Sequence, residues 1–287
     1  MKAIYLVLLL TLIIPAAASA NEIDDLKTLQ DVNAFLKKLR PEAYNEIALD
    51  EKNPSKTEFG KNTFHKIDLD GDKATDLVVD SRYLFVVIAK ANGKHELNVL
   101  DQGSFLMRGY TLTGIVTDKG ENCIVIRPVE RKDRPSPDST DPITLVWKFG
   151  DFIEANPKPD AFRIEKISFS TGGCYGTCPI FDIDIRPDKK ATYNAKRFNK
   201  PDGQFSGTID DTAYAQLAQT IDYMGLDHLK SEYSVPWTDD RGSLLTITYD
   251  GGKVKKINDY GMIGTFGLAN LYNQFYALRT SQKWTAK

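Results

Sequence analysis

Near its end the chain reads Leu244-Leu245-Thr246-Ile247-Thr248-Tyr249-Asp250-Gly251-Gly252-Lys253-Val254-Lys255-Lys256-Ile257. The β-branched and aromatic residues on both sides are typical of strands, and Asp250-Gly251-Gly252 is a strong turn signal. The stretch therefore predicts a β-hairpin of residues 244–249 and 254–257. Because the strands of a hairpin run antiparallel, the sheet that contains them is predicted to be mostly antiparallel.

The residues that precede and follow this hairpin carry strand and helix patterns. Alternation predicts strands at 162–169, 180–185, 192–197 and 204–209. Apolar residues at helical spacing predict a helix to about Met224, capped by Asp210 or Asp211, and a second helix over 266–278. Strands, helix, hairpin and helix in this order indicate an α+β arrangement.

The first half of the chain shows one helical pattern and then strands. Residues 21–39 predict an amphipathic helix that ends before Pro41. Strands are predicted at 77–79, 84–89, 97–100, 111–116, 123–127 and 143–149. Pro157 and Pro159 indicate a linker at 155–160. The predicted fold class is α+β with two domains, 21–154 and 161–287, each a mostly antiparallel sheet with one or two packed helices.

The N-terminus has the three parts of a secretory signal. Lys2 gives a short positive start, an apolar run extends to Ile14, and Ala18-Ser19-Ala20 fits the cleavage pattern. Residues 1–20 therefore predict a signal peptide and an exported protein, periplasmic or secreted. No later stretch is apolar enough to cross a bilayer, so no transmembrane segment is expected after cleavage.

Composition narrows the classes of possible partner and the possible states of the cysteines. The chain has 37 Lys and Arg against 39 Asp and Glu, and the basic residues are scattered. Neither nucleic acid nor an anionic membrane is therefore expected as a partner, and the oligomeric state stays open. The three cysteines of an exported chain allow at most one disulfide and one spare thiol.

An acidic loop runs from Asp68 to Asp76. Aspartates stand at its positions 1, 3, 5 and 9, and calcium prefers six to eight hard oxygen ligands. Without a cation, these carboxylates would repel one another. The loop therefore predicts a structural calcium site with the ligands Asp68, Asp70, Asp72, Asp76 and, through its carbonyl, Ala74.

This loop resembles the calcium loop of integrin-type FG-GAP/VCBS repeats. The resemblance covers Asp68 to Val79 and includes the apolar strand that follows the loop. The family usually has glycine at position 6, where this chain has Lys73, so a non-glycine residue must accept the turn. A single copy cannot build the propeller of that family.

The string Gly172-Gly173-Cys174-Tyr175-Gly176-Thr177-Cys178-Pro179 lies between two predicted strands. In an exported protein it favours a local disulfide between Cys174 and Cys178. Two alternatives remain: a thiol-based redox site and a soft-metal site, although the spacing is not that of a thioredoxin motif. Cys123, in an apolar segment, is predicted to be a buried free thiol, and its pairing with the loop stays open.

From about Phe162 to Trp284 the chain resembles an uncharacterised bacterial family, a domain of unknown function found mostly in exported proteins and lipoproteins. The resemblance is carried by the G-C-Y-G-x-C-P string at 173–179, by Thr238-Asp239, and by the hairpin at 252–257 followed by Asp259-Tyr260-Gly261. It implies the α+β domain and brings no activity.

No catalytic motif is found, and the histidines His65, His95 and His228 are far apart in the sequence. Whether the protein is an enzyme is uncertain, and the sequence favours a non-catalytic binding or interaction protein with an envelope or extracellular partner. The alternative is a thiol-based redox or metal-handling protein that uses Cys174 and Cys178. A possible binding cleft is formed by Trp237, Asp239, Arg241, Asp259 and Tyr260, although an exposed loop is the commoner meaning of such a string.

Overall fold

The computed structural model describes residues 21–52, 61–90, 92–100, 109–129 and 140–287. The predicted signal peptide, residues 1–20, lies outside the described residues. In the described ranges, no helix combines the length and the apolar character that a membrane crossing needs. Helices and mostly antiparallel sheets make up the described chain, as the sequence predicts.

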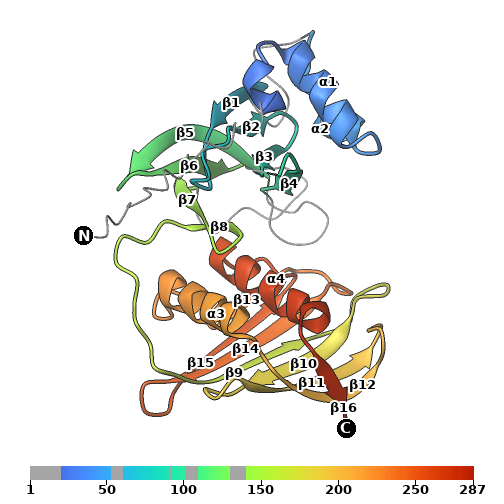
Figure 1. The fold of residues 1–287 in the computed structure, drawn as a ribbon, viewed down its shortest axis with the longest axis vertical. Coiled ribbons are helices and arrows are strands. Elements are labelled where there is room, and N and C mark those ends of the chain that lie inside the picture. The colour runs from blue at the N-terminus through green and yellow to red at the C-terminus, as the bar shows by residue number, and fades with distance from the viewer. Residues whose placement is uncertain (1–20, 53–60, 91, 101–108, 130–139) are drawn as a thin grey trace, which may run out of the picture.

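The elements are stacked in layers along the long axis of the molecule (Figure 1). The helix α1 (Leu29–Leu39) lies at one end and covers a four-stranded sheet. A second four-stranded sheet packs on the other face of the first. The helices α3 (Asp211–Met224) and α4 (Phe266–Ser281) follow, and an eight-stranded sheet lies at the far end.

The helix predicted over 21–39 is interrupted in the structure. A 3-10 turn η1 (Glu22–Asp25) precedes α1, and a short helix α2 (Tyr44–Ile47) follows it. Thr28 caps α1: its Oγ1 accepts from the Asp31 backbone N–H, and the Asp31 carboxylate accepts from the Thr28 N–H. This capping box fixes a new helix start, so the chain bends where the apolar spacing continues.

The first two sheets are antiparallel and have sequential strand order. The first contains β1 (Thr63–Ile67), β2 (Asp76–Asp80), β3 (Leu84–Ala89) and β4 (His95–Val99). The second contains β5 (Tyr110–Asp118), β6 (Glu121–Pro128), β7 (Ile143–Lys148) and β8 (Asp151–Glu154). Strands β2 and β3 are buried on both faces, between α1 and the second sheet, which explains their continuous apolar sequences.

The third sheet has the order β13-β15-β14-β9-β10-β11-β12-β16. Its strands are β9 (Ile164–Thr171), β10 (Ile180–Ile185), β11 (Lys190–Arg197), β12 (Gly203–Thr208), β13 (Glu232–Ser234), β14 (Gly242–Tyr249), β15 (Lys253–Tyr260) and β16 (Trp284–Ala286). The predicted hairpin is confirmed: β14 and β15 pair antiparallel from Tyr249 and Lys253 onward. The short strand β13 pairs parallel with β15.

Helix α4 is buried on two sides. Its Leu268, Leu271 and Phe275 belong to the core above the eight-stranded sheet, whereas Phe266 belongs to the core between the first two sheets. The Glu154 carboxylate, at the end of β8, accepts hydrogen bonds from the backbone N–H groups of Phe266 and Gly267, at 2.6 and 2.9 Å. Helix α4 therefore connects the two parts of the chain that the predicted linker separates.

Candidate functional site

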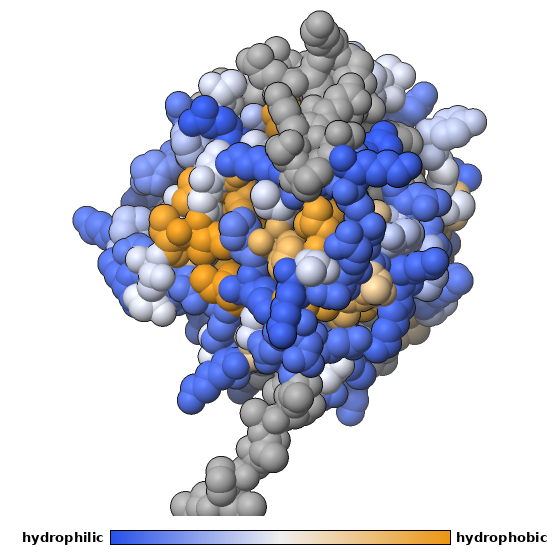
Figure 2. Space-filling model, turned by 90° about the horizontal axis from the view of Figure 1, so that it is seen from above, coloured by the Kyte–Doolittle hydropathy of each residue, from blue (hydrophilic) through white to orange (hydrophobic). Residues whose placement is uncertain are grey.

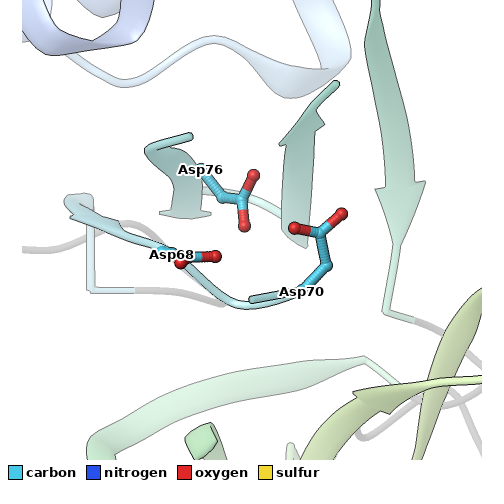
Figure 3. A group of neighbouring side chains, drawn as sticks. All are labelled: Asp68, Asp70 and Asp76. Carbon is cyan, nitrogen blue, oxygen red and sulfur yellow. The ribbon is translucent and has the colours of Figure 1, made fainter. Parts of the chain in front are cut away.

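Three of the predicted calcium ligands converge on one point (Figure 3). Asp68 follows β1, Asp70 lies in the loop, and Asp76 begins β2. Each offers one carboxylate oxygen, and these oxygens lie within 4.8 Å of one another. Hard oxygen atoms from acidic side chains in a tight loop are the donors that calcium prefers.

Backbone hydrogen bonds fix the shape of this acidic loop. The Asp76 carboxylate accepts from the N–H groups of Leu69 and Ala89, at 2.7 and 2.8 Å. The Asp68 carboxylate accepts from Gly71 and Lys73, at 2.8 and 3.0 Å. Lys73 has φ of +73°, so the position where the FG-GAP pattern has glycine does require a left-handed residue.

The charges of the loop act on Asp76. The pKa of its carboxyl is raised to about 7, chiefly by burial; the hydrogen bonds from Leu69 and Ala89 lower it, and the nearby Asp70 and Asp68 raise it. A side-chain cation also lies beside the three aspartates: Lys90 Nζ is 3.1 Å from the Asp70 carboxylate. The site therefore favours positive charge, and a lysine ammonium supplies part of it.

The remaining predicted ligands lie differently. Asp72 is exposed, and its carboxylate accepts from the Ala74 N–H at 2.7 Å, so it closes a local turn. Asn122, on β6, donates to the Asp68 carbonyl at 2.7 Å. Asn122, on β6, and Lys90, just after β3, reach the loop from elsewhere in the chain, and nothing near the loop in the sequence pointed to them.

Residues 172–179 form a loop, which we call the cysteine loop. It is closed by a disulfide between Cys174 and Cys178, whose Cα atoms are 5.8 Å apart. It is also held against the loop that precedes β14: the Gly172 N–H donates to the Gly242 carbonyl, and the Tyr175 N–H donates to the Asp239 carbonyl, both at 2.8 Å. The Tyr175 side chain is 88 % exposed. The structure thus presents one aromatic ring on a covalently closed loop.

The residues of the predicted cleft fall into three groups. Asp239 is exposed and its carbonyl contacts the cysteine loop; Arg241 is half-buried, and it is the next residue, Gly242, that contacts this loop. Trp237 and Tyr260 instead hold Asp240: the indole Nε1 donates to its carboxylate at 3.1 Å, and the Tyr260 hydroxyl accepts from its N–H. Asp259 is fully buried, and its carboxylate accepts from the N–H groups of Ile263 and Gly264. Asp259 therefore shapes the turn before α4 and lines no surface.

The cysteines have no further metal ligand beside them in the described ranges. The group of three or more acidic, histidine or cysteine side chains found there is the one formed by Asp68, Asp70 and Asp76. Cys123 is a free, buried thiol on β6, and burial raises its pKa. The structure adds no observation that favours the redox or soft-metal alternative.

Two hollows lie away from these loops. A cavity of about 670 Å³ lies on the outer face of the eight-stranded sheet, where Lys166 pairs with Asp184 at 2.9 Å. Apolar residues gather on the face of the molecule seen in Figure 2. A cavity of about 240 Å³ near α2 and β4 includes Ile47, Leu97 and Val99 in its lining. Neither lining includes a residue of the acidic loop or the cysteine loop.

Comparison with known families gives one result. A family described as a domain of unknown function (DUF6438) matches residues 165–279, from β9 almost to the end of α4. The match includes the cysteine loop and the segment that packs against it. No curated protein and no solved structure matches the chain. The integrin-type resemblance of the acidic loop is not confirmed by these comparisons.

Proposed function

We propose that this chain is an exported, non-catalytic binding protein, with its binding surface at the cysteine loop and a structural calcium ion in the acidic loop. The matching family carries no assigned activity, which is compatible with this proposal. The partner is an envelope or extracellular protein or ligand.

One observation supports this binding surface: Tyr175 is exposed on a loop that two separate interactions hold in place. The disulfide closes the loop, and the hydrogen bond from the Tyr175 N–H to Asp239 attaches it to the neighbouring segment. Exposed tyrosines provide large contact area at low cost in conformational entropy, and rigid presentation lowers the cost of binding further. Such residues are enriched among those that dominate binding energy.

Quantitative capture of partners from the envelope fraction tests this surface. Wild-type protein and the Tyr175→Ala variant are compared with Phe198→Ala, which removes another exposed aromatic ring from a different loop. Proteins retained by the wild type and by Phe198→Ala, but lost by Tyr175→Ala, are expected. Identical recovery with all three proteins, or no specific recovery, would remove the proposal.

The calcium ion is proposed as a stabiliser because three carboxylates converge where a cation lowers their mutual repulsion. A ligand that binds only the folded state stabilises it by about 2.7 kcal/mol when present at about a hundred times its dissociation constant. For a chain of this size, the melting temperature is then expected to rise by roughly 5–10 °C.

Melting temperatures in calcium and in chelator check this expectation. The Asp70→Asn variant is expected to lose most of the rise, because Asp70 belongs to the converging group. Asp118→Asn, an exposed aspartate at the end of β5, serves as the control and is expected to keep it. Equal melting temperatures with and without calcium would exclude the structural ion.

A further inference from the structure

Two arginines, Arg241 and Arg279, lie on the helix side of the eight-stranded sheet. Arg279, in the last turn of α4, lies with its guanidinium carbon 5.0 Å from the centre of the Phe181 ring and 5.7 Å from that of Tyr276. Arg241 immediately precedes β14, two residues before the buried Ser243. The alternation of side chains along β14 places Arg241 on the face that the helices cover.

Within the described part of the chain, neither guanidinium group has a hydrogen-bond acceptor for its Nε–H. The Nε atom of each is also buried. Neither group forms an ion pair with a described carboxylate, whereas Arg40, Arg163 and Arg186 each pair with one at the surface. A buried donor without an acceptor costs about 1–3 kcal/mol, and more when the group is charged, so such groups call for an explanation.

The charges of both arginines act on the Tyr276 hydroxyl. Burial raises the pKa of this hydroxyl, and the positive charges of Arg241 and Arg279 lower it. Two cations that act on one half-buried hydroxyl repel each other, and an anion bound between them would offset this repulsion.

The arginines lie at the base of the cysteine loop. Phe181, under Arg279, follows Cys178 by three residues, and its N–H donates to the Thr171 hydroxyl at 3.0 Å. The neighbour of Arg241, Gly242, accepts from the Gly172 N–H. One arginine therefore adjoins each end of the loop that presents Tyr175.

We propose that Arg241 and Arg279, with the Tyr276 hydroxyl, form a binding site for an oxyanion, a carboxylate or a phosphate group of the ligand that the cysteine loop contacts. A guanidinium offers five N–H donors in a planar fork that matches the oxygens of both groups. The aromatic rings of Phe181 and Tyr276 support the Arg279 fork from its face. The proposal rests on the proposed binding function and names the chemistry of its ligand.

Calorimetric titration with inorganic phosphate and with succinate, at constant ionic strength, tests the site and distinguishes the two oxyanions. Tighter binding of one probe identifies the preferred group. Arg241→Gln and Arg279→Gln are each expected to weaken binding by about tenfold or more, because each loses a charge-assisted hydrogen bond. Arg186→Gln, which removes an exposed arginine that lines the cavity on the outer face of the sheet, is expected to bind as the wild type does.

Wild-type protein that binds neither probe, or binding that survives in both variants, would overturn the proposal. So would loss of binding in Arg186→Gln, which would move the site to the outer face. The melting temperatures of the variants without any anion provide a second readout. They are expected to equal or exceed that of the wild type, because one of two repelling charges is gone, and a clear decrease in both would assign the arginines a structural role instead.

The anion titration does not depend on the capture of a protein partner, so the two proposals can fail separately. Phosphate binding with unchanged partner capture by Tyr175→Ala would remove the proposed binding surface and leave the anion site. Tyr175-dependent capture without phosphate or succinate binding would remove the anion site and leave the proposed binding surface.

Discussion

Asp80 lies at the end of β2, where its side chain is almost completely buried. Its carboxylate accepts from the Thr111 hydroxyl and the Leu112 N–H, at 2.8 and 2.9 Å, and so connects the first sheet to β5 of the second. Burial raises the pKa of this carboxyl, against those hydrogen bonds, which lower it. The folded chain therefore retains a proton on Asp80 at pH values where the unfolded chain has lost it.

This raised pKa predicts how stability changes with pH. The unfolded carboxyl titrates near its usual pKa of 3.8, so the contribution of Asp80 is fully present below that value. It is lost as the pH rises through the raised folded pKa, by at most about 1.4 kcal/mol per pH unit for one proton. Asp80→Asn is expected to remove this slope in the free energy of unfolding, measured by urea titration at a series of pH values.

Asp118→Asn is a suitable control for this measurement, because Asp118 is exposed and lies on β5 of the same pair of sheets. An unchanged slope in Asp80→Asn would show that the burial of Asp80 is not linked to proton uptake on folding.

At the scale of elements, the N-terminus of α4 depends on a residue from another part of the chain. Glu154, on β8, accepts from the Phe266 and Gly267 N–H groups, which have no acceptor within the helix. A carboxylate at this position also interacts favourably with the helix dipole. Burial raises the pKa of Glu154, so the environment partly opposes its charge.

Replacing Glu154 should destabilise both β8 and α4, which this residue connects. Glu154→Ala is expected to lower the free energy of unfolding by about 1–3 kcal/mol, because two buried donors lose their acceptor. Glu154→Gln retains one acceptor oxygen and is expected to cost less. Chemical denaturation measures the difference, and Glu232→Ala, on the exposed edge strand β13, is the control. Equal stability of Glu154→Ala and the wild type would show that water replaces the cap without loss.

Elements that depend on residues nearby in the sequence could be predicted from it. Elements that depend on contacts with distant residues could not. The β14–β15 hairpin depends on the turn Asp250-Gly251-Gly252, whose two glycines have φ of +83° and +92°. In contrast, β8 and β16 have four and three residues, too few for a periodic pattern. Strand β16 exists because Trp284 pairs with Gly207, a partner far away in the sequence.

The candidate sites follow the same rule. Asp68, Asp70 and Asp76 lie in one short segment, so their convergence could be expected from spacing alone. Arg241 was recognisable only as part of a polar loop. Arg279, by contrast, belongs to a helix whose pattern is explained by packing, and only the tertiary structure lets its charge act on the same tyrosine as that of Arg241.

At the scale of the whole molecule, α4 and the end of α3 form a layer that packs against both the second sheet and the eight-stranded sheet. We call it the shared layer. Ile153 of β8 packs with Cys123 and Val146 on one side and with Tyr223 and Met224 of α3 on the other. Asn270 of α4 donates to the Lys148 carbonyl, and Gln216 of α3 donates to that of Phe149. These contacts predict that the two parts of the chain stabilise each other.

Gly267 is the position where this prediction is sharpest. A Cβ atom there would lie 3.0 Å from Met224 Cβ and 3.2 Å from Ile153 Cδ1, so a larger side chain must push the layers apart. Gly267→Val is expected to accelerate amide hydrogen exchange in β2 and β3 as well as in β9 and β10, because opening the shared layer exposes both cores. Gly114→Val, where a Cβ meets nothing within 4 Å, should leave both regions protected. Faster exchange on one side of the layer alone would show that the two parts unfold as independent units.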